Sequence, residues 1–285
     1  MEKLHAHHEK LIGTIRELVE RTKADPAEAS LLVSYCGEFL LAHAEAEEST
    51  LYNADANAEF VDKMVREHRE IKELLESIGN ALGTGGASLI ISESARFMEL
   101  LNAHFLEEEN ILMPRLSNKM SEGEMENLIT EAHRVEGEKK RSDIWSLFEL
   151  DHKRIDLNMS RMRMPGVHLD AARHYYSRMR GQLLKHIELE ETVLFPAFEE
   201  HANPGQMGPV QVMISEHREI VSIISPSLED IDEESLRSRT DLLIGKLAVH
   251  NKKEELILYP MINRTLQASH RARVFKESFD GLAAA

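Results

Sequence analysis

Four similar segments of this chain each contain a histidine followed four residues later by a glutamate. The pairs are His43 with Glu47, His104 with Glu108, His186 with Glu190, and His250 with Glu254. In an α-helix this spacing places both side chains on one face, one turn apart. Each pair is followed by leucine or methionine, by an aromatic residue in three copies, and by a proline in three copies. Imidazole and carboxylate are both metal-binding groups, so the repeated pair indicates a metal site.

Single histidines stand between and before these pairs. The pentapeptide EHREI occurs around His68 and again around His217, with apolar residues at −7, −4, −3, +3 and +7 in both copies. These offsets describe one face of a helix with the histidine in its middle. His152 precedes the third pair, and His8 lies 144 residues before His152. His5 is close by, so the choice between His8 and His5 as the first ligand stays open.

The order of histidine, pair, histidine, pair therefore occurs twice. His43 and His186 are 143 residues apart, and the next two matched histidines are 149 and 146 residues apart. The chain is thus a tandem repeat of two units of similar length. Each core would hold four imidazoles and two carboxylates, and an unpaired buried carboxylate costs several kcal/mol. A bound metal would compensate for that cost.

Helices are required to position these residues. Glycine and proline are sparse and aromatic residues make up 5%, which favours helices over strands. Apolar periodicity and helix breakers predict helices at 2–22, 27–53, 57–82 and 87–117, then at 143–163, 168–201, 206–225 and 231–267. Four helices with short connections form an antiparallel bundle. We predict an all-α fold with bundles at 1–118 and 143–270, a helical linker at 119–142 and a C-terminal tail at 271–285.

Charge and cysteine content exclude several classes of protein. The formal net charge is −16, and an acidic surface repels phosphate backbones, so no nucleic-acid partner is expected. The single cysteine, Cys36, excludes an intramolecular disulfide and a thiolate-held iron–sulfur cluster. No apolar run reaches about 18 residues, and the N-terminus lacks the apolar core of a signal peptide. We expect no membrane association and a cytoplasmic location.

The number of candidate ligands indicates the kind of metal centre. Six protein ligands per unit exceed the four of a closed zinc site. They suit two metal ions that share bridging carboxylates, and a bridged pair with free positions points to iron. A ferritin-like centre built from two E-x-x-H motifs is not favoured, because Glu2 with His5 and Glu149 with His152 occupy different places in the repeat.

This set of motifs resembles the hemerythrin-like, or HHE cation-binding, family over residues 1–118 and 143–270. The resemblance implies a four-helix bundle around a non-haem di-iron centre in each unit. Carried over residue by residue, it implies a first ligand set of His8, His43, Glu47, His68, His104 and Glu108. It implies a second set of His152, His186, Glu190, His217, His250 and Glu254.

Two departures from the oxygen-carrying members bear on function. Lys72 and Val221 stand where those members have a second histidine on the third helix, and both units end in H-x-x-x-E rather than H-x-x-x-x-D. The set is more similar to di-iron proteins that handle nitric oxide and repair iron–sulfur clusters, but their N-terminal cysteine-bearing domain is not found here. The iron-sensing domain of a ubiquitin-ligase subunit shares the pattern too.

We therefore expect two iron ions per bundle, bridged by oxo, hydroxo or carboxylate groups, and a protein that binds or senses O2, NO or iron. Enzyme-like handling of NO or peroxide, iron donation for cluster repair, and a structural scaffold are the alternatives. Nothing resembles a flavin or nicotinamide site, so a reductant or protein partner would be external and is not identified. This favours binding or sensing over enzymatic turnover.

The glutamates beside the motifs are expected to lie mostly on the solvated side of each helix, although one could hold an imidazole N–H. They are Glu48, Glu107, Glu109, Glu188, Glu191 and Glu255. Glu191, for example, lies about 100° around the helix from Glu190, and its loss is expected to matter little.

Overall fold

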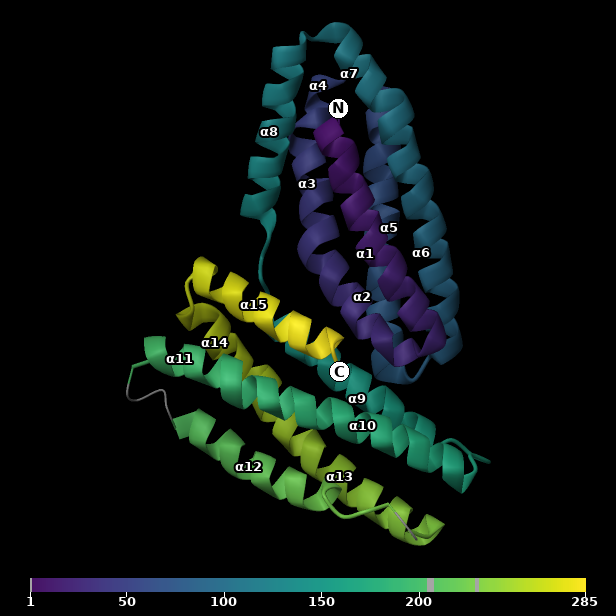
Figure 1. Ribbon diagram of the computed structural model, residues 1–285, viewed down its shortest axis with the longest axis vertical. Coiled ribbons are helices and arrows are strands. Elements are labelled where there is room, and N and C mark those ends of the chain that lie inside the picture. The colour runs from purple at the N-terminus through teal and green to yellow at the C-terminus, as the bar shows by residue number, and fades with distance from the viewer. Residues whose placement is uncertain (1, 204–207, 229–230) are drawn as a thin grey trace. The chain divides into compact units, whose positions relative to one another are not determined.

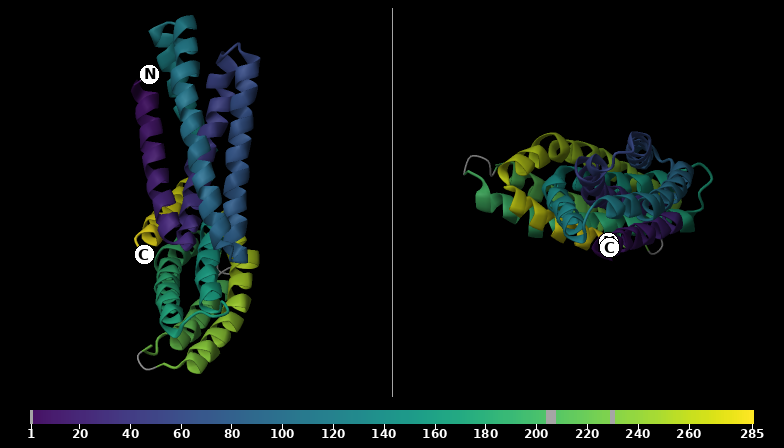
Figure 2. Two further views of the ribbon diagram at one scale, coloured as in Figure 1. Left: turned by 90° about the vertical axis from the view of Figure 1, so that its right-hand side faces the viewer. Right: turned by 90° about the horizontal axis from the view of Figure 1, so that it is seen from above.

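The computed structural model describes residues 2–203, 208–228 and 231–285, and this part of the chain contains helices and no strand (Figure 1). It divides into two compact units, Met1–Arg141 and Ser142–Ala285, each of which carries four bundle helices. Figure 2 shows the long helices of each unit lying alongside one another. The predicted all-α fold of two tandem bundles is confirmed. Among the described residues, no helix is both long enough and apolar enough to cross a membrane.

The first bundle follows the predicted helix order. Its first and third helices are α1 (Glu2–Ala24) and α5 (Ala58–Thr84). The second helix starts at Pro26, with the Asp25 side chain accepting a hydrogen bond from the Ala27 amide, and comprises α2 (Ala29–Tyr35), a π-helical turn (Cys36–Leu40), α3 (Leu41–Ser49) and α4 (Leu51–Ala54). The fourth comprises α6 (Ala87–Glu107), a π-helical turn (Glu108–Leu112) and α7 (Met113–Lys119).

The segment 119–142, expected as a helical linker, contains α8 (Glu122–Lys139), which begins with a capping box between Ser121 and Glu124. Figure 1 shows α8 lying beside α3. Its apolar face, with Met125, Ile129 and Ala132, is buried in the same core cluster as Leu51 and Tyr52. The linker therefore forms a fifth helix on the first bundle.

The second bundle consists of α9 (Ile144–Met162), α10 (Leu169–Leu189) with α11 (Phe195–His201), α12 (Gly208–Ile224), and α13 (Glu233–Lys253) with α14 (Tyr259–Thr265). Residues 206 and 207, the predicted start of its third helix, lie outside the described residues.

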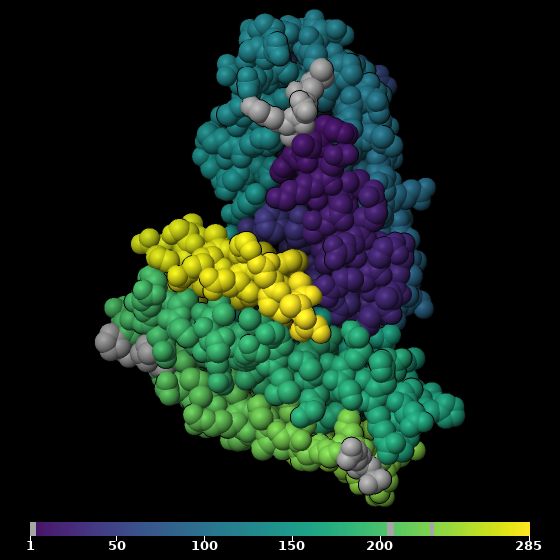
Figure 3. All heavy atoms as spheres, in the orientation of Figure 1, coloured from purple at the N-terminus to yellow at the C-terminus, as the bar shows by residue number. Residues whose placement is uncertain are grey.

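The predicted C-terminal tail, 271–285, lies mostly within one more helix, α15 (Ala268–Ala283). This helix packs on α9 and α10, and Figure 3 shows it in yellow on the green surface of the second unit. A Cβ atom added at Gly281 would come within 2.7 Å of Leu189, so α15 approaches α10 closely at that point.

Three of the four H-x-x-x-E motifs end in a π-helical turn that starts at the glutamate: Glu108–Leu112, Glu190–Leu194 and Glu254–Leu258. Each turn precedes a proline by two residues. Proline lacks an N–H and its ring clashes with the carbonyl four residues earlier, and the wider π-turn accommodates both effects. The first copy has Asn53 in place of proline, and its helix instead breaks at Thr50, where φ is −124° and ψ is −77°.

Candidate metal centres

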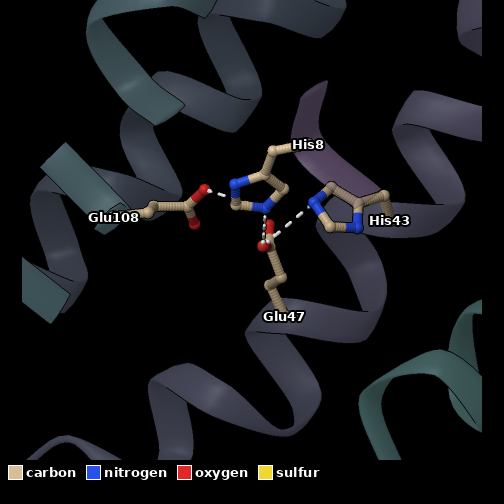
Figure 4. Close-up of side chains that lie close together, drawn as sticks. All are labelled: His8, His43, Glu47 and Glu108. Carbon is tan, nitrogen blue, oxygen red and sulfur yellow. Dashed lines mark ion pairs between the residues drawn. The ribbon is translucent and has the colours of Figure 1, made fainter. Parts of the chain in front are cut away.

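The six residues predicted for the first unit meet in the core of the first bundle. All six are buried, with exposed fractions between 1% and 7%. Figure 4 shows four of them, with ion pairs drawn from His8 to both glutamates and from His43 to Glu47. The Glu47 Oε1 atom lies 3.0 Å from Nε2 of His43 and 3.5 Å from Nε2 of His8. His5 lies outside this cluster, with a side chain that is 56% exposed.

The other side of the first cluster is formed by α5 and α6. The His68 Nε2 atom lies 3.6 Å from Glu47 Oε2, and the His104 Nε2 atom lies 3.6 Å from Glu108 Oε1. Two four-residue groups result, one with His8 and His43 and the other with His68 and His104, and both include Glu47 and Glu108. Within each group the possible ligand atoms lie within 4.8 Å of one another.

The second bundle repeats this arrangement. Its cluster contains His152 from α9, His186 from α10, His217 from α12, His250 from α13, and the two glutamates Glu190 and Glu254. The distance from Nε2 of His217 is 3.2 Å to Glu190 and 3.6 Å to Glu254. Nε2 of His152 lies 3.3 Å from Glu254, and Nε2 of His250 lies 3.1 Å from it.

Several inward-facing atoms in these clusters lie within ion-pair distance of one another but make no well-directed hydrogen bond. In the first bundle they are Nε2 of His8 and His43, both carboxylate oxygens of Glu47, and Oε2 of Glu108. In the second bundle they are Glu190 Oε2, His217 Nε2 and Glu254 Oε1. Leaving such groups buried without partners costs free energy, and metal ions between them would satisfy these lone pairs. The donor set of imidazoles and carboxylates therefore fits metal cations.

Each histidine also has a carboxylate at its other ring nitrogen, Nδ1. The glutamate that follows each motif glutamate serves the histidine of a neighbouring helix. Distances from the carboxylate to Nδ1 are 2.9 Å for Glu48 and His68, 3.3 Å for Glu109 and His8, 2.8 Å for Glu191 and His217, and 2.7 Å for Glu255 and His152. Such partners fix the ring orientation and raise the basicity of a metal-binding histidine.

The first glutamate of each EHREI segment does the same. Glu67 lies 2.8 Å from Nδ1 of His104, and Glu216 lies 3.0 Å from Nδ1 of His250. Each pentapeptide thus supplies one inward histidine and a carboxylate that holds the histidine of the next helix. Of the six glutamates expected to face solvent, only Glu107 and Glu188 pair with lysines instead.

The remaining two histidines have partners that differ between the bundles. Glu136 of α8 lies 3.4 Å from Nδ1 of His43, whereas Asp151 of α9 lies 2.9 Å from Nδ1 of His186. Asp151 also pairs with Arg154, which is 1% exposed. Burial raises the pKa of the Asp151 carboxyl, but its bonds to His186 and Arg154 bring the pKa below the usual range.

Protonation supplies the positive charge that these carboxylates need when no metal is bound. Burial lowers the pKa of His43, His152 and His217, but the facing carboxylates raise it more strongly, to about 10 in each case. Burial and the charge of Glu47 together raise the pKa of Glu108 to about 7. Metal ions require neutral imidazole, so protons and metal compete for the same nitrogen atoms.

Two tyrosines reach the clusters without having been predicted as site residues. Tyr52 and Tyr259 each stand five residues after a motif glutamate. In a regular α-helix that position lies about 140° around the axis from the glutamate, on another face. The break at Thr50 and the π-turn Glu254–Leu258 change this geometry, so both phenols point at carboxylates of the core. The aromatic residue after three of the motifs was the signal in the sequence.

The chain matches the family model described as hemerythrin HHE cation binding domain, over residues 1–135 and again over residues 143–262. No curated protein and no solved structure matches it. The two matched segments correspond to the two bundles, and each contains one complete set of the clustered histidines and glutamates.

Proposed function

Because the chain belongs to the hemerythrin HHE cation-binding family, we propose that each bundle holds two iron ions and binds a small ligand such as O2 or NO. The observation that carries this proposal is the sharing of carboxylates between neighbouring donor groups. Glu47 and Glu108 belong to both groups of the first bundle, and Glu254 belongs to both groups of the second. A shared carboxylate is what two adjacent ions need in order to be bridged.

The residues of each cluster would have different roles in metal binding. The four Nε2 atoms of each bundle would bind the ions, and the carboxylates would bridge them. The carboxylates at Nδ1 keep the rings oriented and exclude the wrong tautomer. Iron would supply the coordination positions and electrons for a small ligand, while the buried leucine and isoleucine side chains exclude bulk water. Lys72 lies outside the first cluster with a 60% exposed side chain, so it adds no ligand there.

The second bundle also has space for a ligand of the proposed size. A cavity of about 10 Å³ borders His152, His186 and His250, and its other walls include Ile155, Leu183 and Leu247. That volume corresponds to about one water-sized sphere. Sites for organic substrates are typically about 300 Å³ or larger, so a diatomic molecule fits here and an organic substrate does not.

Metal content and gas binding test the proposal. Protein produced with adequate iron should contain about two iron ions per bundle, and the optical spectrum of the reduced form should change on addition of NO or O2. A double variant, His68→Ala with His217→Ala, should lose most of this change, whereas His174→Ala, at an exposed residue outside both clusters, should retain it. A chain that takes up zinc at one ion and no iron would overturn the proposal, and so would an iron-loaded, reduced protein that responds to neither gas.

A further inference from the structure

Tyr52 is buried against one half of the first cluster. Its side chain is 2% exposed, and its hydroxyl donates a hydrogen bond of 2.6 Å to Oε1 of Glu108. The Tyr52 hydroxyl oxygen lies 3.3 Å from Nε2 of His68 and 3.5 Å from Nε2 of His104. These three residues belong to one of the two donor groups of the bundle, and no tyrosine contact of this kind is present at His8 and His43 among the described residues.

Tyr259 has the corresponding contacts in the second bundle, but with the opposite half. It is fully buried, and its hydroxyl donates to Glu190 Oε1 at 2.7 Å and lies 3.3 Å from Glu254 Oε2. Its oxygen lies 3.4 Å from Nε2 of both His152 and His186. Those histidines come from the first and second helices of the bundle, whereas the partners of Tyr52 come from the third and fourth.

The sequence repeat explains why the two tyrosines contact opposite halves of their clusters. Each tyrosine stands nine residues after a motif histidine, Tyr52 on the second helix and Tyr259 on the fourth. The matching position on the fourth helix of the first bundle is Met113, and on the second helix of the second bundle it is Phe195. A thioether is a soft donor that hard ferric iron does not favour, and a phenyl ring donates nothing. Among the described residues, each cluster therefore has one phenol in contact with it, on alternate halves of the repeat.

The distances are those expected between ligands of one ion. Two donors that each lie about 2.1 Å from a metal are about 3.0 Å apart at right angles and about 3.4 Å apart at tetrahedral angles. The phenol oxygens lie 3.3 to 3.5 Å from the histidine nitrogens in both bundles. Tyrosine oxygen is an established donor to ferric iron in proteins.

We propose that Tyr52 and Tyr259 are additional metal ligands, each coordinating one ferric ion of its bundle as a phenolate. This inference rests on the proposed iron centres. On coordination the phenol O–H bond breaks, the oxygen binds the ion, and the proton is released to solvent, as is general when metals displace protons from their ligands. Tyr52 shares its ion with His68 and His104, and Tyr259 shares its ion with His152 and His186.

In the first bundle the two ions would then be unequal, because Tyr52 gives the half with His68 and His104 one protein donor more than the half with His8 and His43. In the second bundle Tyr259 would compensate for Glu190, which belongs only to the group of His217 and His250. The cavity of the second bundle borders His152 and His186 as well as His250, so it reaches both halves. The more open coordination is therefore expected at His8 and His43 in the first bundle.

Optical and Raman spectra of the iron-loaded, air-oxidised full chain test the assignment. Phenolate bound to ferric iron gives a visible charge-transfer absorption, and excitation within it enhances the ring vibrations of the bound tyrosine. The variants Tyr52→Phe and Tyr259→Phe should each lose about half of this absorption, and the double variant should lose all of it while retaining its iron. Tyr176→Phe is the matched control, because Tyr176 is a fully buried tyrosine that packs in the apolar core of the second bundle.

The outcomes separate this inference from the function on which it rests. Iron-loaded wild-type protein without a phenolate absorption, or a double variant with an unchanged absorption, would overturn the assignment and leave the iron centres standing. A chain that binds no iron would overturn both. If a variant fails to fold, Raman spectra of wild-type protein made with ring-deuterated tyrosine decide, since the enhanced vibrations must shift if tyrosine is the ligand and stay unshifted if it is not.

Discussion

Replacing Glu191 by alanine should weaken metal binding in the second bundle about tenfold. Its Oε1 atom lies 2.8 Å from Nδ1 of His217, whose Nε2 faces the cluster. Loss of a carboxylate in this role costs about 10- to 100-fold in metal affinity. The Glu191 side chain is 37% exposed, so water can replace part of the lost hydrogen bond and the lower end of that range applies. Tenfold corresponds to about 1.4 kcal/mol of binding free energy.

The matched control is Glu188→Ala, three residues earlier on the same helix. Glu188 is 57% exposed and pairs only with Lys185 among the contacts of the described residues, so its removal should leave affinity unchanged. Both variants are made in a full chain whose first centre is disabled by Glu47→Ala, and affinity is measured by competition with a chelator. Equal metal affinities for the two variants would contradict the reasoning, because the contact between Glu191 and His217 would then contribute nothing to metal binding.

Three further predictions follow from the same contacts. Glu190→Ala should remove metal from the second bundle alone, so elemental analysis should find about half of the wild-type content; full content would refute its role as a ligand. Asp151→Ala should lower the free energy of unfolding by about 3 kcal/mol, because the buried Arg154 and His186 each lose a carboxylate contact; a denaturant titration that shows a loss of less than about 1 kcal/mol would contradict this. Metal-free protein should lose thermal stability as the pH rises from 6.5 to 10. Folding raises the pKa of His43 and His217 from 6.5 to about 10, so these protonated histidines stabilise the fold fully below pH 6.5 and no longer do so above about pH 10. Metal-loaded protein should instead lose stability as the pH falls below about 6.5, where protons displace the metal; melting curves with the same pH dependence for both forms would show that metal and protons do not compete.

The helices were predictable because their signals are local. Apolar spacing identified the buried faces, and Asp25 with Pro26 marked a helix start that the structure shows at Pro26. The π-turns were not predicted. Three of them precede Pro114, Pro196 and Pro260, and form where a proline acts on a helix that packing holds on both sides; the turn at Cys36–Leu40 has no proline after it. The helix α15 had a periodic signal as well, with Val274, Ser278 and Leu282 at spacings of four.

The inward residues were predictable because they repeat, whereas their outer partners required knowledge of the neighbouring helix. A residue next to Glu190 points about 100° away from it, which on an isolated helix means solvent. In a bundle, however, each helix has neighbours on two sides. At that angle Glu191 meets His217 of α12 instead of water. The predicted direction of the Glu191 side chain was correct, but the presence of His217 in that direction depends on how the helices of the bundle pack.

The carboxylate that contacts the histidine of the second helix comes from a different element in each bundle, and this difference indicates a role for α8. His7 occupies the position in the first unit that matches Asp151 in the second, so α1 cannot supply the carboxylate that His43 needs. Glu136 of α8 supplies it, lying 3.4 Å from His43 Nδ1 and 3.0 Å from His7 Nε2. In the second bundle, the partners of the clustered histidines among the described residues all come from its own four helices. Displacing α8 would therefore remove a group that orients a candidate ligand of the first centre. In the second bundle the corresponding carboxylate, Asp151, comes from α9 itself, and the added helix α15 contacts it indirectly, through Arg154, which donates to the Leu282 carbonyl.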